Sequence, residues 1–139
     1  MALRNRHTTL TDNGRLRCMS TKVEGVHVLD VCGEIDFAVR NEFKSVLNTV
    51  VASAQAPLVV DLTAVRYIDS SGFAELISAW KQMVERRERF YVVSGPNVRR
   101  LLRILGLDRV FDQYSTQRSA IASALRDAGG DPCGLGALP

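Results

Sequence analysis

Leu58-Val59-Val60-Asp61-Leu62 and, shortly after it, Asp69-Ser70-Ser71-Gly72 mark the place where a β-strand pattern gives way to a helix pattern. The β-branched run predicts a buried strand. After the glycine, apolar residues recur three and four apart, as on one face of a helix: Phe73, Leu76, Ile77, Trp80, Met83 and Val84. Free N–H groups and the positive end of the helix dipole meet at such a helix start. An exposed serine there could cap the helix, bind an anion or receive a phosphate.

The rest of the chain alternates strand and helix patterns around this hinge. Before the hinge, turn residues and apolar spacing predict a hairpin (16–23 and 26–31, turning at Glu24-Gly25) and then a helix (39–50). After it they predict a strand (90–93), a helix from Pro96 to Gly106, a short strand at Val110-Phe111 and a last helix capped at Ser115-Thr116. This order predicts one α/β domain with a mixed, mostly parallel sheet of about five strands, an N-terminal antiparallel hairpin and about four helices. We expect a flexible arm over residues 1–13, the domain over 14–128 and a flexible tail over 129–139.

Composition narrows the class of protein. The chain has 139 residues, of which 46% are hydrophobic, enough for one domain with a core. No apolar run approaches the ~20 residues of a membrane span or forms a secretory signal, so we expect a cytoplasmic protein without a membrane partner.

The net charge of +3 invites a nucleic-acid interpretation, which the distribution of charge does not favour. The clusters at 86–89 and 99–103 interrupt amphipathic patterns without interleaved aromatic residues. They indicate solvated helix faces or, less simply, a patch for an acidic protein partner. We expect no direct contact with nucleic acid.

The cysteines and histidines do not form a metal pattern. Cys18, Cys32 and Cys133 lack C-x-x-C spacing, and His7 and His27 are the two histidines. A turn at 24–25 places Cys18 opposite Val31, so a Cys18–Cys32 disulfide would need a change of register. Two small buried thiols on neighbouring strands are the simpler interpretation. A redox layer resting on Cys18 and Cys32 is a hypothesis.

Catalytic motifs are missing as well. Ser70 lacks the leading glycine of a G-x-S-x-G elbow, and neither histidine has a natural place as its base. There is no phosphate-binding glycine loop of either common type. The residues therefore give only weak support to a small-molecule or nucleotide-binding enzyme. We expect a protein that is not an enzyme and needs no cofactor or metal of its own.

Two interpretations of the hinge stay open at this point. In one, the Ser70 hydroxyl simply caps the helix, worth roughly 1 kcal/mol. Capping alone explains neither Gly72, which costs roughly 0.5–1 kcal/mol inside a first turn, nor Phe73 where a capping box has Glu or Gln. In the other, the hinge also faces a partner, and Asp69 forms with Asp36 an acidic patch for a cation or a basic surface.

Four motifs in order resemble the STAS domain family, and most closely the bacterial anti-sigma-factor antagonists. They are Gly33-Glu34-Ile35-Asp36, Val59-Val60-Asp61-Leu62, Tyr67-Ile68-Asp69-Ser70-Ser71-Gly72, and the segment from Arg100-Leu101-Leu102 to Leu105-Gly106-Leu107-Asp108-Arg109-Val110-Phe111. The resemblance covers about residues 15–127. It departs from the family's pattern at Ala74, where a further small glycine is usual.

The resemblance implies a phosphorylation-controlled change of partner. The unmodified antagonist binds an anti-sigma factor, a serine kinase of the histidine-kinase-like ATPase superfamily, and so releases a sigma factor; a PP2C-type phosphatase reverses the modification. Carried onto this chain, the phosphoacceptor is Ser70, and the partner-binding residues are Asp36, Asp69, Ser71, Gly72 and Phe73. We expect a monomer or weak dimer. The alternative is a STAS module of another complex, such as a stressosome-like subunit or a soluble transporter partner.

Overall fold

The computed structural model describes residues 7–127, which form a six-stranded mixed sheet with helices on both faces. The elements in chain order are β1 (Thr8–Asp12), β2 (Leu16–Val23), β3 (Val26–Ile35), the 3₁₀ turn η1 (Phe37–Val39), α1 (Arg40–Ser53), β4 (Leu58–Ile68), α2 (Ser70–Glu85), β5 (Phe90–Val93), α3 (Pro96–Ile104), the 3₁₀ turn η2 (Leu107–Arg109), β6 (Asp112–Tyr114) and α4 (Gln117–Asp127). The sheet order follows the sequence. β1–β3 pair antiparallel and β3–β6 pair parallel, which confirms the predicted α/β class.

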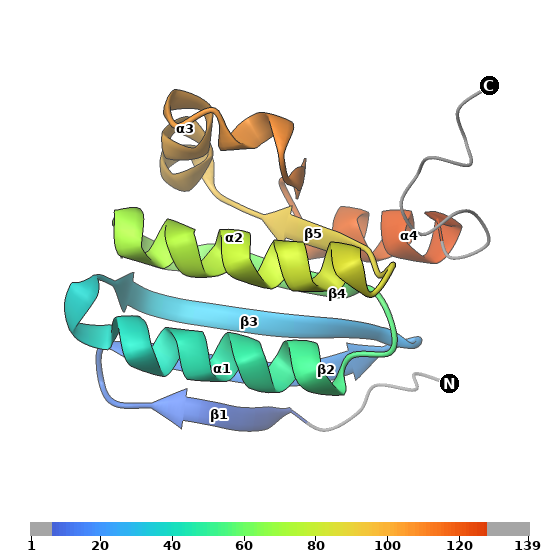
Figure 1. Cartoon of the computed structure of the whole chain (residues 1–139), viewed down its shortest axis with the longest axis horizontal. Coiled ribbons are helices and arrows are strands. Elements are labelled where there is room, and N and C mark those ends of the chain that lie inside the picture. Colours follow the sequence, from blue (N-terminus) through green and yellow to red (C-terminus); the bar gives the residue numbers. More distant parts are fainter. Residues whose placement is uncertain (1–6, 128–139) are drawn as a thin grey trace.

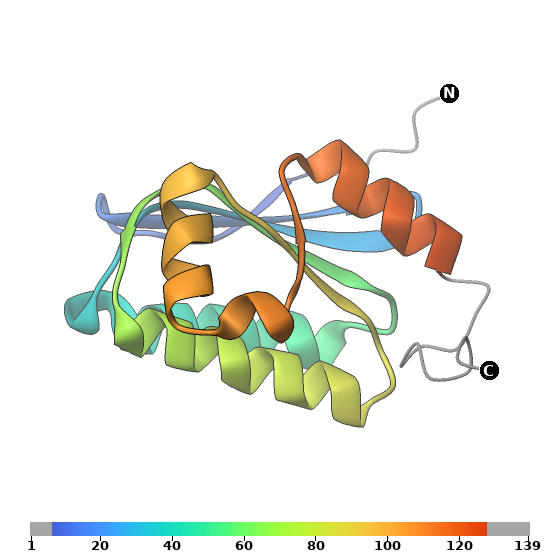
Figure 2. The ribbon, with the colours of Figure 1, turned by 90° about the horizontal axis from the view of Figure 1, so that it is seen from above.

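Helices α1 and α2 cover one face of the sheet and α4 covers the other, as Figures 1 and 2 show. The strands supply a core to each side because successive side chains point to opposite faces. On β3, Leu29 and Val31 belong to the larger core beneath α1 and α2, whereas Val26 and Val28 pack with Ala120 of α4.

The hinge strand is longer than the sequence predicts. β4 continues past Leu62 to Ile68, following β3 with two irregularities of register until Ile68 lies opposite Ile35. Its last residues do not alternate regularly between buried and exposed, which hides them from a period-two pattern. The extension carries the hinge to the carboxyl edge of the parallel strands, where α1, α2 and α3 begin.

The prediction of a flexible arm over residues 1–13 is wrong for residues 8–12. Thr8–Asp12 form edge strand β1, which pairs with β2 from Thr8 opposite Ser20 to Asp12 opposite Arg17, and the sheet therefore has six strands rather than about five. An edge strand with one apolar residue, Leu10 packed against the core, carries almost no periodic signal. Residues 1–6 of the arm and the tail expected over 129–139 lie outside the described residues.

The last third confirms the predicted helix boundaries but corrects one strand. Pro96 begins α3, Gly106 follows it in the left-handed conformation (φ 75°), and the Thr116 hydroxyl accepts from the Ser119 N–H at 3.1 Å at the start of α4. The strand expected at Val110-Phe111 lies instead at Asp112–Tyr114. Phe111 lies between η2 and β6, and its side chain is in the core, where its ring packs against those of Trp80 and Phe90. Within residues 7–127, none of the helices combines the length and the hydropathy needed to cross a membrane.

Candidate functional site

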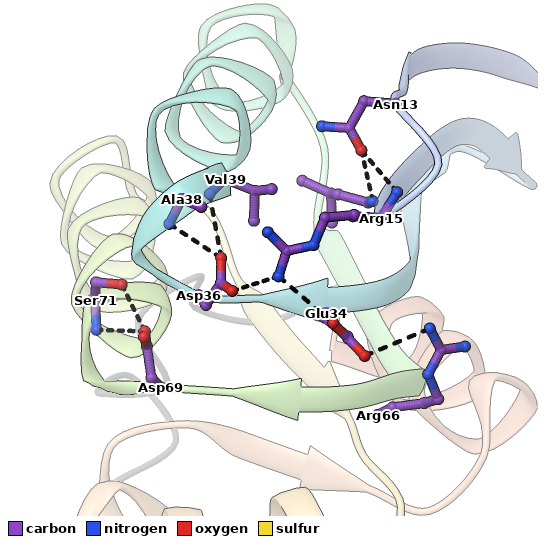
Figure 3. A network of polar contacts seen from close by, with 10 residues as sticks. Asn13, Arg15, Glu34, Asp36, Ala38, Val39, Arg66, Asp69 and Ser71 are labelled. Atoms are coloured by element: carbon purple, nitrogen blue, oxygen red, sulfur yellow. Dashed lines mark hydrogen bonds and ion pairs between the residues drawn. The ribbon is translucent and has the colours of Figure 1, made fainter.

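Two Ile-Asp pairs lie side by side at the carboxyl edge of the sheet. Ile35-Asp36 ends β3 and Ile68-Asp69 ends β4; the isoleucines are register partners, and the Asp69 N–H donates to the Ile35 carbonyl at 3.0 Å. Each aspartate then caps the helical turn that follows it, η1 for Asp36 and α2 for Asp69 (Figure 3). The structure thus brings together the two carboxylates that the acidic-patch interpretation requires.

Asp69, not Ser70, is the N-cap of α2. Its Oδ1 accepts from the N–H groups of Ser71 (3.0 Å) and Gly72 (3.3 Å) and from the Ser71 hydroxyl (2.5 Å). The Ser71 hydroxyl is the largest cause that holds the pKa of Asp69 below its usual value, and the N–H groups of Gly72, Ser71 and Phe37 add to it. The capping role expected of Ser70 is therefore wrong by one residue, since the preceding carboxylate accepts more donors than a hydroxyl can.

The Ser70 side chain has no structural role among the described residues. It is the first residue of α2 and is exposed, and within residues 7–127 no side-chain hydrogen bond holds its hydroxyl. Ser71, by contrast, is half-buried with its hydroxyl engaged by Asp69. The two adjacent serines therefore differ sharply in how available their oxygens are.

An ion-pair network surrounds Asp36. Its Oδ1 accepts from the N–H groups of Ala38 (3.0 Å) and Val39 (3.3 Å), and its Oδ2 accepts from the Arg15 guanidinium (Figure 3). The Arg15 hydrogen bond is the main cause that lowers the pKa of Asp36, and the same contact raises the pKa of Arg15. The carboxylate therefore stays ionised at the carboxyl edge of the sheet.

Glu34 joins this network from the end of β3. Arg15 reaches it at 3.5 Å, and Arg66 of β4 reaches it at 3.7 Å. Sequence reasoning missed both arginines because their positions depend on strand register. One signal was available in Gly33, whose φ of 116° allows the backbone to lie against Arg15, where a Cβ would come within 1.9 Å of the Arg15 carbonyl oxygen.

Gly72 and Phe73 do not lie on the surface that the sequence assigns to them. Gly72 is buried, and an added Cβ would lie 2.7 Å from Ile35 Cγ2 and 2.8 Å from Ile68 Cγ1. Phe73 is buried in the core beneath α2. The glycine therefore lets α2 approach the strand ends, which explains the residue that capping alone could not. Both Gly72 and the Phe73 side chain are buried in this conformation, and their part in binding a partner stays a prediction.

Two exposed aromatic residues near the hinge were not anticipated. Phe37 follows Asp36 and is 73% exposed, and its N–H contributes to the lowered pKa of Asp69. Tyr67, two residues before Asp69, is 53% exposed. Phe37 falls outside the apolar stripe expected for α1, which was the available signal. Large apolar groups beside two carboxylates are typical of a protein-binding surface.

Asp69 and Ser70 line neither of two cavities formed by the described residues. One, of about 260 Å³, lies beside the ion-pair network and is lined by residues that include Arg15, Gly33 and Arg66. A cavity of about 580 Å³ lies elsewhere, between the β2–β3 hairpin and α4, lined by residues that include Thr21, Asp30, Gln117 and Ile121. No group of three or more His, Cys, Asp and Glu side chains suited to a metal ion occurs within residues 7–127. The carboxylates of Asp36 and Asp69 are instead occupied by N–H, hydroxyl and guanidinium donors.

The two described cysteines do not face one another. Cys18 is the register partner of Val31, as predicted, and Cys32 is the partner of Arg17. Residues adjacent on a strand point to opposite faces, so Cys18 lies in the core beneath α1 while Cys32 lies on the other face. Both are free thiols in the structure, and a disulfide between them would require one strand to turn over. The register therefore does not support a Cys18–Cys32 disulfide, and a redox layer resting on these residues stays a prediction.

We expect the thiols to react unequally in the folded protein. Burial raises the pKa of Cys18 to about 12, which keeps it a thiol, whereas Cys32 is half-buried. In a Cys133→Ser background, an aromatic disulfide reagent at pH 8 should titrate one thiol quickly, and mass spectrometry should place the label on Cys32. Rapid labelling of Cys18, or an internal Cys18–Cys32 bond under mild oxidation, would contradict this description.

Comparison with known proteins identifies the family that this site belongs to. A family model of the STAS domain matches residues 17–120. The chain therefore belongs to the STAS domain family. A relative that is 34% identical over most of both chains places it in the group of anti-sigma factor antagonists.

Individual relatives agree with this grouping. The chain is 34% identical over 98 residues to the anti-sigma-F factor antagonist RsfB of Mycobacterium tuberculosis, covering 70% of this chain and 80% of that protein. A crystal structure of an anti-sigma factor antagonist from Mycobacterium paratuberculosis has a TM-score of 0.73 at 29% identity, covering 84% of this chain and 99% of that one. The Bacillus cell fate determinant SpoIIAA in its phosphorylated form shares the fold, with a TM-score of 0.56 at 15% identity over 85% of this chain and 98% of that one.

Proposed function

We propose that this chain binds an anti-sigma factor while Ser70 is unmodified, so that a sigma factor is released, and that phosphorylation of Ser70 ends the complex. The partner is a serine kinase of the histidine-kinase-like ATPase superfamily, and a PP2C-type phosphatase restores the free serine. The chain itself is a cytoplasmic binding protein, monomeric or weakly dimeric, without catalysis or a cofactor of its own. The relative at 34% identity is an anti-sigma-F factor antagonist, which supports this role over that of a transporter or stressosome module.

The difference between the two hinge serines carries the proposal. Phosphoryl transfer needs a hydroxyl that a kinase can approach in line with its donor phosphate. Ser70 is exposed at the first position of α2, whereas the Ser71 hydroxyl already donates to Asp69 at 2.5 Å. Modification of Ser71 would first have to break this hydrogen bond to the capping carboxylate.

The transfer itself uses groups that the kinase supplies. The Ser70 Oγ forms a bond to the γ-phosphorus of ATP as the bond to the ADP oxygen breaks, and the hydroxyl proton passes to a base of the kinase. This chain contributes the nucleophilic oxygen and holds it at a fixed place on a helix start.

The phosphate should change binding and leave the fold intact. It brings about −1.5 to −2 charges to a helix N-terminus, where negative charge is favourable. Asp69 remains the N-cap of α2, since the donors to its carboxylate come from Ser71, Gly72 and Phe37 rather than from Ser70. Within a complex, however, the new charge would be desolvated beside the carboxylates of Asp36 and Asp69, which opposes close packing.

Replacing each serine in turn tests the acceptor. With the cognate kinase and ATP, Ser70→Ala should reduce incorporation of phosphate at least about 100-fold, because it removes the exposed hydroxyl of the two hinge serines. Ser71→Ala should still be phosphorylated at position 70, at a rate within a few-fold of the original protein. Phosphopeptide mapping by mass spectrometry gives the site directly.

Both variants should remain folded, which a thermal melt checks. Ser71→Ala removes one donor to Asp69 and should cost about 1 kcal/mol of unfolding free energy, whereas Ser70→Ala should cost less. Undiminished phosphorylation of Ser70→Ala, with the phosphate found at Ser71, would show that Ser71 is the phosphoacceptor and that the proposal is wrong.

A further inference from the structure

Helix α3 carries an apolar stripe that the core does not use. Its inner side chains, Val98 and Leu102, are buried beneath the helix. Its outer side and the residue after it present Leu101, Ile104 and Leu105, which are 36%, 70% and 50% exposed. Spacings of three and four place these side chains on one face of a helix. This outer stripe is the pattern by which an amphipathic helix enters a groove of another protein.

The outer stripe is bordered by positive charge. Arg100 and Arg103 lie on α3 next to Leu101 and Ile104 in the sequence, and Arg109 follows in η2; all three are exposed. Within residues 7–127 none of the three forms a salt bridge, and Asp108 is the one acidic residue between Pro96 and Arg109. Arg99, by contrast, is used internally, donating to the Ser94 carbonyl at 2.6 Å and to the Ser115 hydroxyl at 3.1 Å.

The outer stripe lies at the same end of the molecule as Ser70. β4 and β5 are neighbouring parallel strands, so the helices that follow them, α2 and α3, both begin at the carboxyl edge of the sheet. Figures 1 and 2 both show α3 at the end of the molecule where α2 begins. A partner that covers the start of α2 therefore has α3 within its reach.

We propose that the outer stripe of α3 is a second contact for the anti-sigma factor, which would receive it in an apolar groove bordered by carboxylates. This rests on the proposed function and extends its docking surface from the acidic hinge to a basic, apolar helix. A surface with Asp36 and Asp69 at one contact and Arg100 and Arg103 at the other admits one orientation of a complementary partner.

A second copy of this chain fits the outer stripe less well. Symmetric dimers bring the same patch of two subunits together. Two α3 helices packed through Leu101, Ile104 and Leu105 would bring the arginines of both copies into one interface without an acidic residue on the stripe to offset them. Charge complementarity therefore favours an acidic protein partner.

Two kinds of variant separate the apolar and the electrostatic parts. Ile104→Ser/Leu105→Ser removes apolar surface, and Arg100→Glu/Arg103→Glu reverses the charge. Leu125→Ser and Arg118→Glu, both on exposed positions of α4 at the opposite face of the sheet, are the matched controls. The probe is the kinase that phosphorylates Ser70 of the original protein, and binding is measured by calorimetric titration at 50 and 300 mM NaCl.

We expect each α3 variant to weaken binding at least about 10-fold and to raise KM for phosphorylation of Ser70 with kcat nearly unchanged. Both controls should stay within twofold. Binding of the original protein should weaken as salt rises, and the charge-reversed variant should lose this dependence. Thermal melts should agree with the original protein, since the changed side chains are exposed.

Binding of both α3 variants within twofold of the original protein would overturn the second contact while leaving the role of Ser70 intact. A dimer of the original chain that Ile104→Ser/Leu105→Ser abolishes, with kinase binding unchanged, would overturn it too, because the stripe would then be a self-interface. If the original protein itself is neither bound nor phosphorylated by an anti-sigma factor kinase, the proposed function fails, and that result is distinct from the other two.

Discussion

Ser70→Asp should weaken binding of the anti-sigma factor about 100-fold, or ~2.7 kcal/mol, with little change in thermal stability. The introduced carboxylate lies at the first position of α2, where the helix dipole tolerates or favours it by a few tenths of a kcal/mol. In the complex the same charge is desolvated beside Asp36 and Asp69, both of which the surrounding donors keep ionised. The measurement is a calorimetric or surface-based titration at low salt, paired with a melt of the free protein.

Ser70→Asn is the matched control, since it has nearly the shape of Asp without its charge. We expect Ser70→Asn to bind within about 10-fold of the original protein. Equal losses in Ser70→Asp and Ser70→Asn would show that size rather than charge decides binding. A large loss of stability in Ser70→Asp would show that the hinge responds through the fold, contrary to the cap geometry of Asp69.

Gly72→Ala should destabilise the fold by ~1–3 kcal/mol. Two effects compete at this position, because alanine favours the helix by up to about 1 kcal/mol while its methyl group meets side chains of the core. The distances of 2.7 Å to Ile35 Cγ2 and 2.8 Å to Ile68 Cγ1 decide for destabilisation, since β-branched side chains at strand ends have little room to move. The melting temperature should fall by several degrees, because each kcal/mol lost from the free energy of unfolding lowers it by about 2–8 °C.

Gly95→Ala is the control for removing a glycine without a clash. Gly95 precedes α3 with φ −80°, and a Cβ there meets no atom within 4 Å. Its cost should stay below about 1 kcal/mol, from the poorer capping of alanine. If Gly72→Ala is as stable as the original protein, the glycine does not serve close packing, and a surface role for it returns.

The sequence predicted the parts of the fold that depend on local pattern. The hairpin turn at Glu24-Gly25, the start of α3 at Pro96 and its end before Gly106 follow from backbone preferences of single residues, and all three are confirmed. Edge strand β1 was missed because it has one apolar residue and is stabilised by pairing rather than by a buried face.

The sequence located the hinge correctly, but it assigned the N-cap of α2 to Ser70 instead of Asp69. Asp69 and Ser70 are both good N-caps by type, and only the structure shows that the carboxylate takes the donors. Arg15 and Phe37 reach the site through strand register and loop shape, which one sequence does not encode in a readable pattern. Gly72 looked like a surface feature because the isoleucines that crowd it come from two separate strands.

The central claim is that the state of the Ser70 oxygen decides whether the partner binds. The most direct test is to titrate the anti-sigma factor with the unmodified chain, with the chain carrying one phosphate at Ser70, and with the chain carrying one phosphate at Ser71. We predict tight binding of the unmodified chain and a loss of at least about 100-fold on phosphorylation of Ser70, with all three proteins folded. Equal affinity for the unmodified and Ser70-phosphorylated chains would contradict the account.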